Sequence, residues 1–302
     1  MRGLFLYLSH QKQLRSWMET SAAARRLSSR FIAGETLDEA LEVIRKVNRE
    51  GIAVTLDHLG ENVTSLAEAS RSRDVYEQVL SEISAAEMQA NVSLKLSQFG
   101  IDISEEACRE NVGQLVASAA KMNSFVRIDM ESSEYTDRTL AIVTDLHARF
   151  GACGAVIQAY LYRSERDIDC LCREGIRVRL CKGAYLEPAS VAFPSKQDVD
   201  RNFLRLARKL LTEGVYPAIA THDERMISGT LECVRTENLS RDSFEFQMLY
   251  GIRRDLQKTL IAQGYRLRLY VPFGRAWYPY FMRRLAERPA NVLFLARNLF
   301  RE

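Results

Sequence analysis

The sequence predicts a closed (β/α)8 barrel, and three observations support this prediction. Eight short runs of apolar, largely β-branched residues are spread along the chain, and each run ends on a polar or charged residue. The sequence between the runs is mostly helical in character, and strands that alternate with helices form parallel sheets because parallel neighbours need a crossover connection. A chain of 302 residues is long enough for eight such units, which occupy about 250 residues in a typical barrel.

The predicted strands can be given in chain order. The eight apolar runs are residues 53–56, 92–94, 125–128, 155–157, 176–178, 217–220, 244–246 and 267–269. The residues on which they end are Asp57, Lys95, Asp129, Gln158, Arg179, Thr221 with His222, Gln247 and Tyr270. Because the active sites of such barrels lie at the carboxyl ends of the strands, these residues are the first candidates for the site.

Residues 1–50 precede the first predicted strand and are expected to form a helical arm packed on the barrel, which itself spans residues 51–302. Residues 11–30 have helical character. The apolar residues 4–8 could touch a membrane surface, but short apolar runs more often cover part of a core.

A second helix is predicted in the arm at residues 37–50. Thr36 is a suitable N-cap, and Glu39 stands three residues further on, as in a capping box. Gly51 follows the last helical residue and is typical of a helix C-terminus.

The composition favours a soluble cytoplasmic enzyme. The chain is 47% hydrophobic and has a formal net charge of +3, which is too small to indicate nucleic-acid binding. The six cysteines and four histidines are scattered, and Cys170 and Cys172 form only a C-x-C pair, so we expect reduced thiols and no metal site. No apolar stretch in the sequence has the length of a membrane span.

The loop after the fifth run combines several features of a ligand site. Arg179 and Lys182 bring two cations to the barrel mouth, Gly183 lets the backbone approach a ligand closely, and Tyr185 offers a ring for stacking. This combination suits an anionic ligand with a π system, such as a phosphorylated aromatic cofactor. The alternative is an ordinary strand end with solvated charges.

The helix after the eighth run contains adjacent arginines. Arg283 and Glu287 are four residues apart and share one face, and Arg284 is three residues from Glu287. A surface salt bridge is one interpretation. Because the helix is rich in aromatic residues, we favour a second one, in which the arginines bind a substrate carboxylate.

Two further segments carry candidate residues. Thr221 and His222 end the sixth run, and a histidine at a strand end of a barrel favours ligand contact over a purely structural role. His58, Gly60 and Glu61 occupy the loop after the first run, which could act as a lid. The sequence contains no dinucleotide-binding glycine pattern, P-loop, zinc-protease helix or nucleophile elbow.

Together these segments resemble the monofunctional bacterial proline dehydrogenases. The similarity runs in order from about residue 30 to residue 291, and its most specific parts are RLCKGAYLEP and WYPYFMRRLAERPAN. Further matching segments are VTLDHLGE, VSLKLSQFG, VRIDMESSEYTDRTL, ATHDERMI, FEFQMLYG and RLYVPFG.

The resemblance implies a fold, a cofactor and a reaction. The family is a distorted flavin-binding barrel that oxidises L-proline to Δ1-pyrroline-5-carboxylate, the first step of proline degradation to glutamate. Electrons pass from FAD to a membrane quinone, which is compatible with a peripheral position at the inner face of the plasma membrane. A pyrroline-5-carboxylate dehydrogenase is an expected partner.

The resemblance also implies substrate-binding residues at the matching positions. Arg283 and Arg284, with Lys95, would bind the carboxylate of proline, which requires the last helix to lie across the barrel mouth. Tyr270 would pack on the substrate ring. The remaining members of this set are Leu249 and Tyr185 in the pocket and Glu61 as a gate that pairs with Arg283.

A second set would bind the cofactor. Arg179 would lie at the flavin N5, and Asp129 and Arg179 would take part in catalysis. The full set is Asp129, Met130, Gln158, Arg179, Cys181, Lys182, Gly183, Ala184, Tyr185, Thr221, His222 and Glu287. Cys181 stands where the family usually has valine. Asp57 and Gln247 receive no role from the resemblance.

Three alternatives remain at this stage. A hydroxyproline dehydrogenase is the nearest, although the bulk and hydroxyl of Tyr270 would crowd a substituted ring. A barrel lyase, either cofactor-free or metal-dependent, could use the same cationic mouth for an acid substrate. A non-catalytic binding barrel is the least well supported, because so many charged groups converge on one face.

Overall fold

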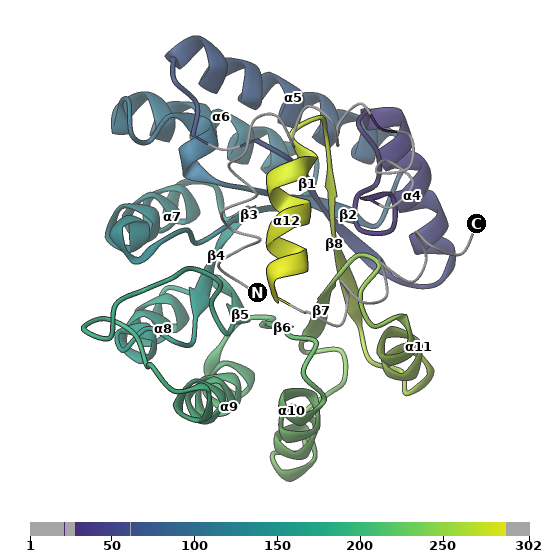
Figure 1. Cartoon of the computed structure of the whole chain (residues 1–302), viewed down its shortest axis with the longest axis vertical. Helices are drawn as coiled ribbons and strands as arrows, with labels where there is room; N and C mark the ends of the chain where they lie inside the picture. Colours follow the sequence, from purple (N-terminus) through teal and green to yellow (C-terminus); the bar gives the residue numbers. More distant parts are fainter. Residues whose placement is uncertain (1–20, 22–27, 61, 288–302) are drawn as a thin grey trace.

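The computed structural model of the protein describes residues 21, 28–60 and 62–287. Within these residues eight parallel strands form a closed barrel in chain order, with β8 hydrogen-bonded to β1 (Figure 1). The strands are β1 (Ala53–His58), β2 (Ala90–Leu94), β3 (Val126–Ile128), β4 (Cys153–Gln158), β5 (Arg177–Cys181), β6 (Ala218–Ala220), β7 (Glu245–Leu249) and β8 (Leu267–Phe273). The predicted (β/α)8 barrel is confirmed.

Helices connect the strands and surround the barrel (Figure 1). They are α5 (Leu66–Ala85), α6 (Glu105–Lys121), α7 (Thr136–Phe150), α8 (Ser164–Arg173), α9 (Lys196–Glu213), α10 (Glu224–Thr236) and α11 (Arg254–Ala262). Two short 3-10 helices, η1 (Leu96–Phe99) and η2 (Ser133–Tyr135), follow β2 and β3. The main apolar core lies between this ring of helices and the outer face of the strands.

The ring is completed by α4 (Leu37–Arg49), which precedes β1 and packs beside β1 and β8 (Figure 1). Its start is the predicted capping box, since the Thr36 side chain accepts from the Glu39 backbone and the Glu39 side chain accepts from the Thr36 backbone. Ile44 and Val47 on its inner face are buried in the main core. Helix α4 therefore fills the place that a helix after β8 takes in a regular barrel.

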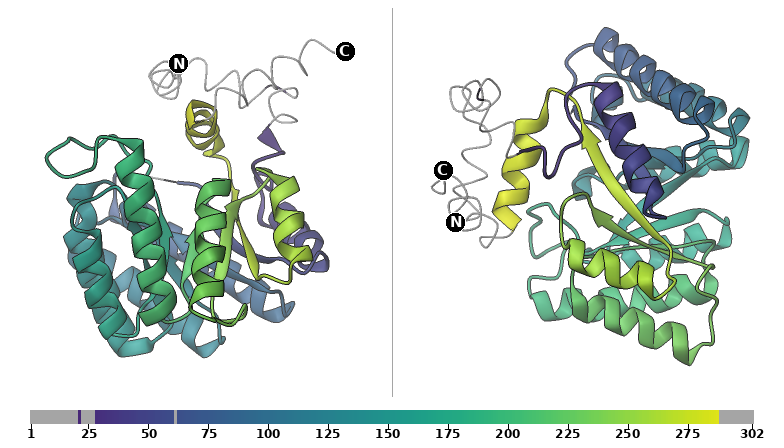
Figure 2. Two further views of the ribbon diagram at one scale, coloured as in Figure 1. Left: turned by 90° about the horizontal axis from the view of Figure 1, so that it is seen from below. Right: turned by 90° about the vertical axis from the view of Figure 1, so that its right-hand side faces the viewer.

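The helix that does follow β8 is α12 (Trp277–Glu287), and it crosses the barrel mouth (Figures 1 and 2). Its apolar residues form a cluster separate from the main core. The buried members of this cluster are Phe31, Ile32, Leu59, Ile252, Trp277, Tyr278, Tyr280, Phe281 and Met282. They come from α12 and from the segments before α4, after β1 and after β7. The predicted position of the last helix across the mouth is confirmed.

The chain approaches itself closely where this cluster forms. Gly251 has a φ of +75°, and a Cβ added there would lie 1.7 Å from the carbonyl oxygen of Arg30. Only glycine fits this position, because it combines a left-handed backbone with a contact to backbone atoms.

Apart from residues 21 and 28–30, the predicted first arm helix (residues 11–30) lies outside the described residues, as do residues 4–8. The division of the chain at residue 50 stays a prediction.

The predicted strand ends are wrong for β1, β4, β5, β7 and β8, which continue to include the polar residue on which each apolar run ends. The reason is the alternation of side chains along a strand. Val178 packs in the outer core, whereas its neighbour Arg179 makes its contacts inside the barrel. A polar residue thus marks an inward position and not the end of pairing. Lys95, Asp129 and Thr221 directly follow β2, β3 and β6, as predicted.

Candidate functional site

The interior of the barrel is polar along its whole length. Buried polar side chains project inward from β1, β2, β3, β5, β7 and β8, and they bond mainly to one another. A buried polar group is tolerated only when its hydrogen bonds are satisfied, so such an interior fixes the orientation of its members.

A carboxylate cluster lies at the carboxyl end of the barrel. The Tyr270 hydroxyl is 2.6 Å from Asp57 Oδ2 and 2.9 Å from Asp129 Oδ2. Lys95 Nζ is 3.3 Å from Asp57 Oδ2, and the Tyr76 hydroxyl donates to Asp57 Oδ1. Burial, together with the two carboxylates, raises the pKa of Tyr270 well above its usual value. The phenol therefore keeps its proton and links the two acids.

Arg179 lies beside this cluster and is 6% exposed. Its Nη1 donates to Asp129 Oδ1 at 2.7 Å and to Ser93 Oγ at 3.2 Å, and its Nε donates to Gln247 Oε1. The guanidinium also lies over the Tyr270 ring, with 5.4 Å between the guanidinium carbon and the ring centroid. Its Nη2 has no hydrogen-bond partner among the described residues. A buried arginine with one nitrogen unsatisfied is a ready donor for a ligand.

A cavity of about 520 Å³ opens at this end of the barrel. It is lined by all the predicted site residues from Lys95 to Tyr270: Lys95, Asp129, Met130, Gln158, Arg179, Cys181, Lys182, Gly183, Ala184, Tyr185, Thr221, His222, Leu249 and Tyr270. Val156, Lys196, Ala220, Asp223, Gln247 and Met248 complete the lining. The structure thus brings these residues from the seven strands β2 to β8 and the loops that follow them into one site.

The loop after β5 forms one wall of the cavity. Gly183 lines the cavity and has a φ of +116°, and a Cβ there would lie 2.4 Å from the Tyr160 ring, so glycine is required at this position. Lys182 Nζ lies 2.7 Å from Asp223 Oδ2 and also bonds to Asp200. The Tyr185 side chain is 38% exposed, which leaves its ring accessible. The loop therefore contributes three features to the cavity wall: the backbone at Gly183, the ion-paired Lys182 and the aromatic ring of Tyr185.

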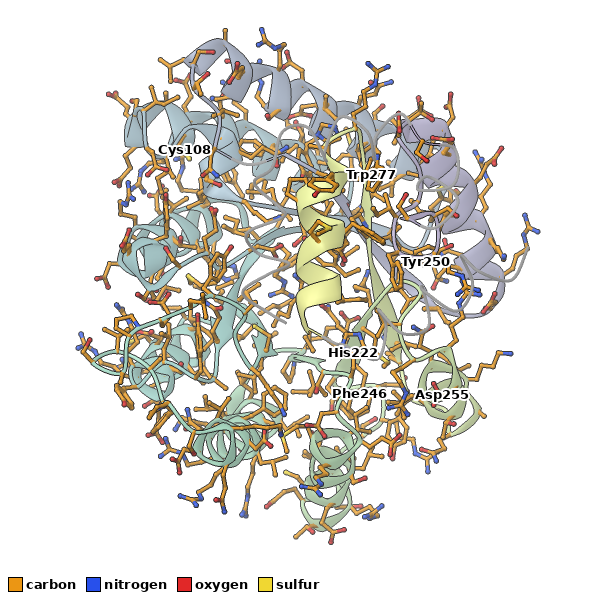
Figure 3. All side chains as sticks on the ribbon, viewed as in Figure 1. Cys108, His222, Phe246, Tyr250, Asp255 and Trp277 are labelled. Atoms are coloured by element: carbon orange, nitrogen blue, oxygen red, sulfur yellow. The ribbon has the colours of Figure 1, made fainter. Side chains whose placement is uncertain are left out.

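His222 connects two strands at the cavity. Its Nε2 lies 2.8 Å from the backbone nitrogen of Leu249 and accepts its hydrogen, so in the neutral ring Nδ1 carries the proton. In the view onto the barrel mouth, His222 lies below the lower end of α12 (Figure 3). The residue is thus both a structural link and part of the cavity wall.

The expectation for the loop after β1 needs a correction. His58 is the last residue of β1 and not part of a free lid, and its ring packs against Phe273 with 5.1 Å between centroids. Burial lowers the pKa of His58, while Asp57 opposes the shift, so a neutral structural histidine results. Glu61 lies outside the described residues. Arg283, Arg284 and Glu287 are on α12, but their side chains also lie outside the described part.

Two residues without a predicted role, Asp57 and Gln247, prove to be members of the polar network. Asp57 accepts from Tyr270, and Gln247 accepts from Arg179. Ser93, which the sequence analysis passed over, bonds to Asp129 Oδ1 at 2.6 Å. Strand alternation could have indicated Ser93, because it stands two residues before Lys95 and so faces the same side of the strand.

Comparison with known proteins identifies the family. The family model for proline dehydrogenase matches residues 40–297. The chain is 41% identical over 302 residues to proline dehydrogenase 2 of Bacillus subtilis, covering 99% of this chain and 98% of the relative. It is 42% identical over 280 residues to a proline dehydrogenase of Deinococcus radiodurans, covering 91% of this chain and 90% of the relative.

The chain belongs to the proline dehydrogenase family. The resemblance inferred from the sequence is therefore confirmed. Among solved structures, proline utilization A of Bdellovibrio bacteriovorus, in a form inactivated by N-propargylglycine, matches with a TM-score of 0.82 and 28% identity. The match covers 87% of this chain and 33% of that protein, so the family barrel forms one part of a longer chain there.

The described residues contain neither a candidate membrane-spanning helix nor a candidate metal site. No helix there is both long and apolar enough to span a lipid bilayer. Within the same part of the chain, no three histidine, cysteine, aspartate or glutamate side chains are grouped in a way that could hold a metal ion.

Proposed function

We propose that the protein is an FAD-dependent proline dehydrogenase that oxidises L-proline to Δ1-pyrroline-5-carboxylate. The observation that carries the proposal is Arg179, which is buried at the cavity, fixed at Nε and Nη1, and unsatisfied at Nη2 among the described residues. A fixed cation with one remaining donor suits an acceptor atom of a ring that gains negative charge during the reaction.

The cavity fits a flavin on three further grounds. Gly183 lines the cavity without a side chain, since a Cβ would collide with Tyr160, and a ligand can approach the backbone closely at this point. The Tyr185 ring can stack on a planar ligand, and Lys182 and Lys196, whose charges Asp200 and Asp223 balance, supply N–H donors for phosphates. The other proposed cofactor contacts are Asp129, Met130, Gln158, Cys181, Ala184, Thr221, His222 and Glu287. The bound flavin supplies the two-electron acceptor for the hydride that leaves C5 of proline.

The protein's own contribution is to hold the substrate. We assign the carboxylate of proline to Arg283 and Arg284 of α12 with Lys95, and the position of α12 across the mouth supports this assignment. Lys95 is near enough to Asp57 to be oriented by it. A carboxylate held at several charged donors fixes the distance and angle of the reacting carbon, which lowers the entropy cost of the reaction. Glu61 is the proposed gate partner of Arg283.

Tyr270 is assigned to the face of the substrate ring, with Leu249 and Tyr185 at its edges. The hydroxyl of Tyr270 is held by Asp57 and Asp129, so the ring has one position. A hydroxyproline dehydrogenase is the second candidate, and this fixed ring disfavours it because a ring substituent would need the same space. The initial rates of dye reduction with L-proline and with trans-4-hydroxy-L-proline distinguish the two, and a higher kcat/KM for hydroxyproline would overturn the preference.

The amine of proline must be neutral for hydride loss, so activity is expected to rise with pH until the bound amine is deprotonated.

We propose that the electrons pass to a quinone at a membrane surface and that the protein has a peripheral cytoplasmic location. A pyrroline-5-carboxylate dehydrogenase is the proposed partner that takes the product.

The absorbance spectrum of the purified protein, before and after anaerobic addition of L-proline, tests the proposal. A flavin spectrum that bleaches with L-proline and persists with D-proline is the expected result. A protein that takes up no added FAD, or whose flavin is not reduced by L-proline, would contradict it and would favour the flavin-free barrel lyase.

A further inference from the structure

We propose that Glu245 and Gln247 are positioning residues that fix the guanidinium plane of Arg179, a residue that lines the cavity, and so the direction of its Nη2, which has no hydrogen-bond partner among the described residues. The inference deepens the proposed function and rests on it, because the direction of that donor matters for a bound flavin. Both residues belong to β7, two positions apart, and so share the inward face of that strand.

The relay is the chain of contacts that runs from Glu245 through Gln247 to Arg179. It begins at the Glu245 carboxylate, which Arg268 holds in place. Glu245 is 4% exposed, and its Oε1 accepts from Arg268 Nε at 2.8 Å. Arg268 is itself fixed, because its Nη1 donates to the carbonyl oxygen of Val54 at 2.9 Å. Burial alone would raise the pKa of Glu245, but Arg268 and Gln247 outweigh it and hold that pKa below the usual value. Glu245 is therefore ionised.

The ionised carboxylate determines which way the Gln247 amide points. A carboxylate can only accept hydrogen bonds, so the amide nitrogen of Gln247 must face it, and Nε2 lies 2.5 Å from Glu245 Oε1. The amide oxygen of Gln247 must then face the opposite way, where it accepts from Arg179 Nε. Arg179 Nε–H can only donate, so it favours the same amide orientation from the other side. With a neutral partner in place of Glu245, the carboxylate's share of this preference is lost.

The second fixed point of Arg179 is its Nη1, which Asp129 and Ser93 hold. A guanidinium is planar, so contacts at Nε and Nη1 define the plane and leave the direction of Nη2 no freedom. Loss of the Gln247 contact would leave Arg179 able to turn about Nη1. The relay thus connects the amino-terminal part of the barrel interior, where Glu245 lines a second cavity, to the cavity at the carboxyl end.

A purely structural role for these residues makes different predictions. Buried network members that only support the fold lower stability when changed, and their effects on function are indirect. A relay acts in series, so the effect of the double variant equals that of one single variant. Three variants separate the two cases: Glu245→Gln, which replaces the carboxylate that anchors the Gln247 amide nitrogen, Gln247→Leu, which removes the acceptor of Arg179 Nε, and the double variant.

Glu232→Gln is the matched control. It makes the same acid-to-amide change at an exposed ion pair with Arg235, and none of the contacts described for these two residues leads to the relay.

Two measurements are made on each protein. The first is the hydrogen-exchange rate of the Arg179 Nε–H, followed by NMR with isotope-labelled arginine and assigned with Arg179→Lys, in the protein without flavin. The second is the midpoint potential of the flavin after loading with FAD. We expect exchange to be at least about tenfold faster in Gln247→Leu and in the double variant, since one charge-assisted hydrogen bond is lost. In Glu245→Gln, exchange should also be faster than in the wild type, because the Gln247 amide has lost its charged anchor. We also expect an equilibrium for flavin reduction about tenfold less favourable, or about 30 mV for a two-electron couple.

Exchange and potential that match the wild type in Glu245→Gln and Gln247→Leu would overturn the relay, as would losses that add in the double variant. Should Glu245→Gln fail to fold, Gln247→Leu alone decides through the exchange rate. If the protein binds no flavin, the proposed function fails, whereas the exchange rates still test the positioning of Arg179.

Discussion

The two layers of the barrel interior use the same residue types differently. In the amino-terminal layer, Arg127 Nη1 donates to the backbone oxygens of Ala155 and Arg177 at 3.0 and 2.6 Å, and Arg268 bonds to Glu245 and to a strand carbonyl. In the carboxyl-terminal layer, Arg179 bonds only to side chains, and its Nη2 has no partner among the described residues.

The difference shows how one barrel separates stability from chemistry. Arginines that bond to strand backbone hold neighbouring strands together and have little left for a ligand. An arginine that is held only by side chains, as Arg179 is, has a fixed orientation but keeps an N–H donor that no protein group among the described residues accepts. We therefore expect substitutions in the amino-terminal layer (the lower layer) to cost mainly stability. Substitutions in the carboxyl-terminal layer (the upper layer) should mainly lower activity.

The largest expected effect is on stability, for Arg268→Leu. It leaves the Glu245 carboxylate buried without its ion-pair partner, and breaking such a pair costs about 3–5 kcal/mol. Urea denaturation followed by circular dichroism measures the loss. Arg235→Leu is the control, because its ion pair with Glu232 is exposed and contributes about 1 kcal/mol or less. Equal losses in the two variants would erase the contrast between the layers.

Arg179→Met is the counterpart in the upper layer. We expect kcat/KM for proline in a dye-reduction assay of the folded variant to fall by about 10²–10³, the usual effect of removing a preorganised donor. Some stability is lost as well, because Asp129 loses its ion-pair partner. Arg177→Met, two residues earlier on the same strand face and exposed, serves as the control with near-normal activity. A variant that unfolds without a specific loss of activity would place Arg179 with the lower layer.

The pH dependence of stability sharpens the comparison further. The pKa of Glu245 is held below its usual value, mainly by Arg268, against the opposing effect of burial. A carboxyl whose pKa is lower in the folded state contributes stability above its unfolded pKa of about 4.5, and the contribution is lost as the pH falls through the folded pKa. The free energy of unfolding should therefore fall more steeply below about pH 4.5 in the wild type than in Glu245→Gln. Parallel curves would contradict this.

The smallest expected effect lies outside both layers, at the start of α4. Thr36→Ala removes the cap of the Glu39 backbone and should cost about 1 kcal/mol with unchanged activity. Thr36→Ser keeps the hydroxyl and should restore most of the loss. A drop in activity at Thr36→Ala would show that the packing of α4 on β1 and β8 affects the site.

The sequence predicted the barrel because the apolar runs and the helical spacing are local signals. It missed where the strands end, since Arg179 and Tyr270 look like terminators until the barrel interior is known to be polar. The cavity wall around Gly183 was predictable from loop composition. The contacts of Gln247 were not, because its partners Arg179 and Glu245 come together only through the strand register and the rotamers that closure of the barrel imposes.

The pairing of β8 with β1 has a consequence for synthesis of the chain. Until the residues of β8 leave the ribosome, one edge of β1 has no partner, and α4 can be only half packed. An unpaired strand edge invites association with other chains, so the nascent protein is exposed to this hazard for most of its translation. Helix α12 is made later still, so the residues that cover the mouth of the barrel are the last of the described elements to be synthesised.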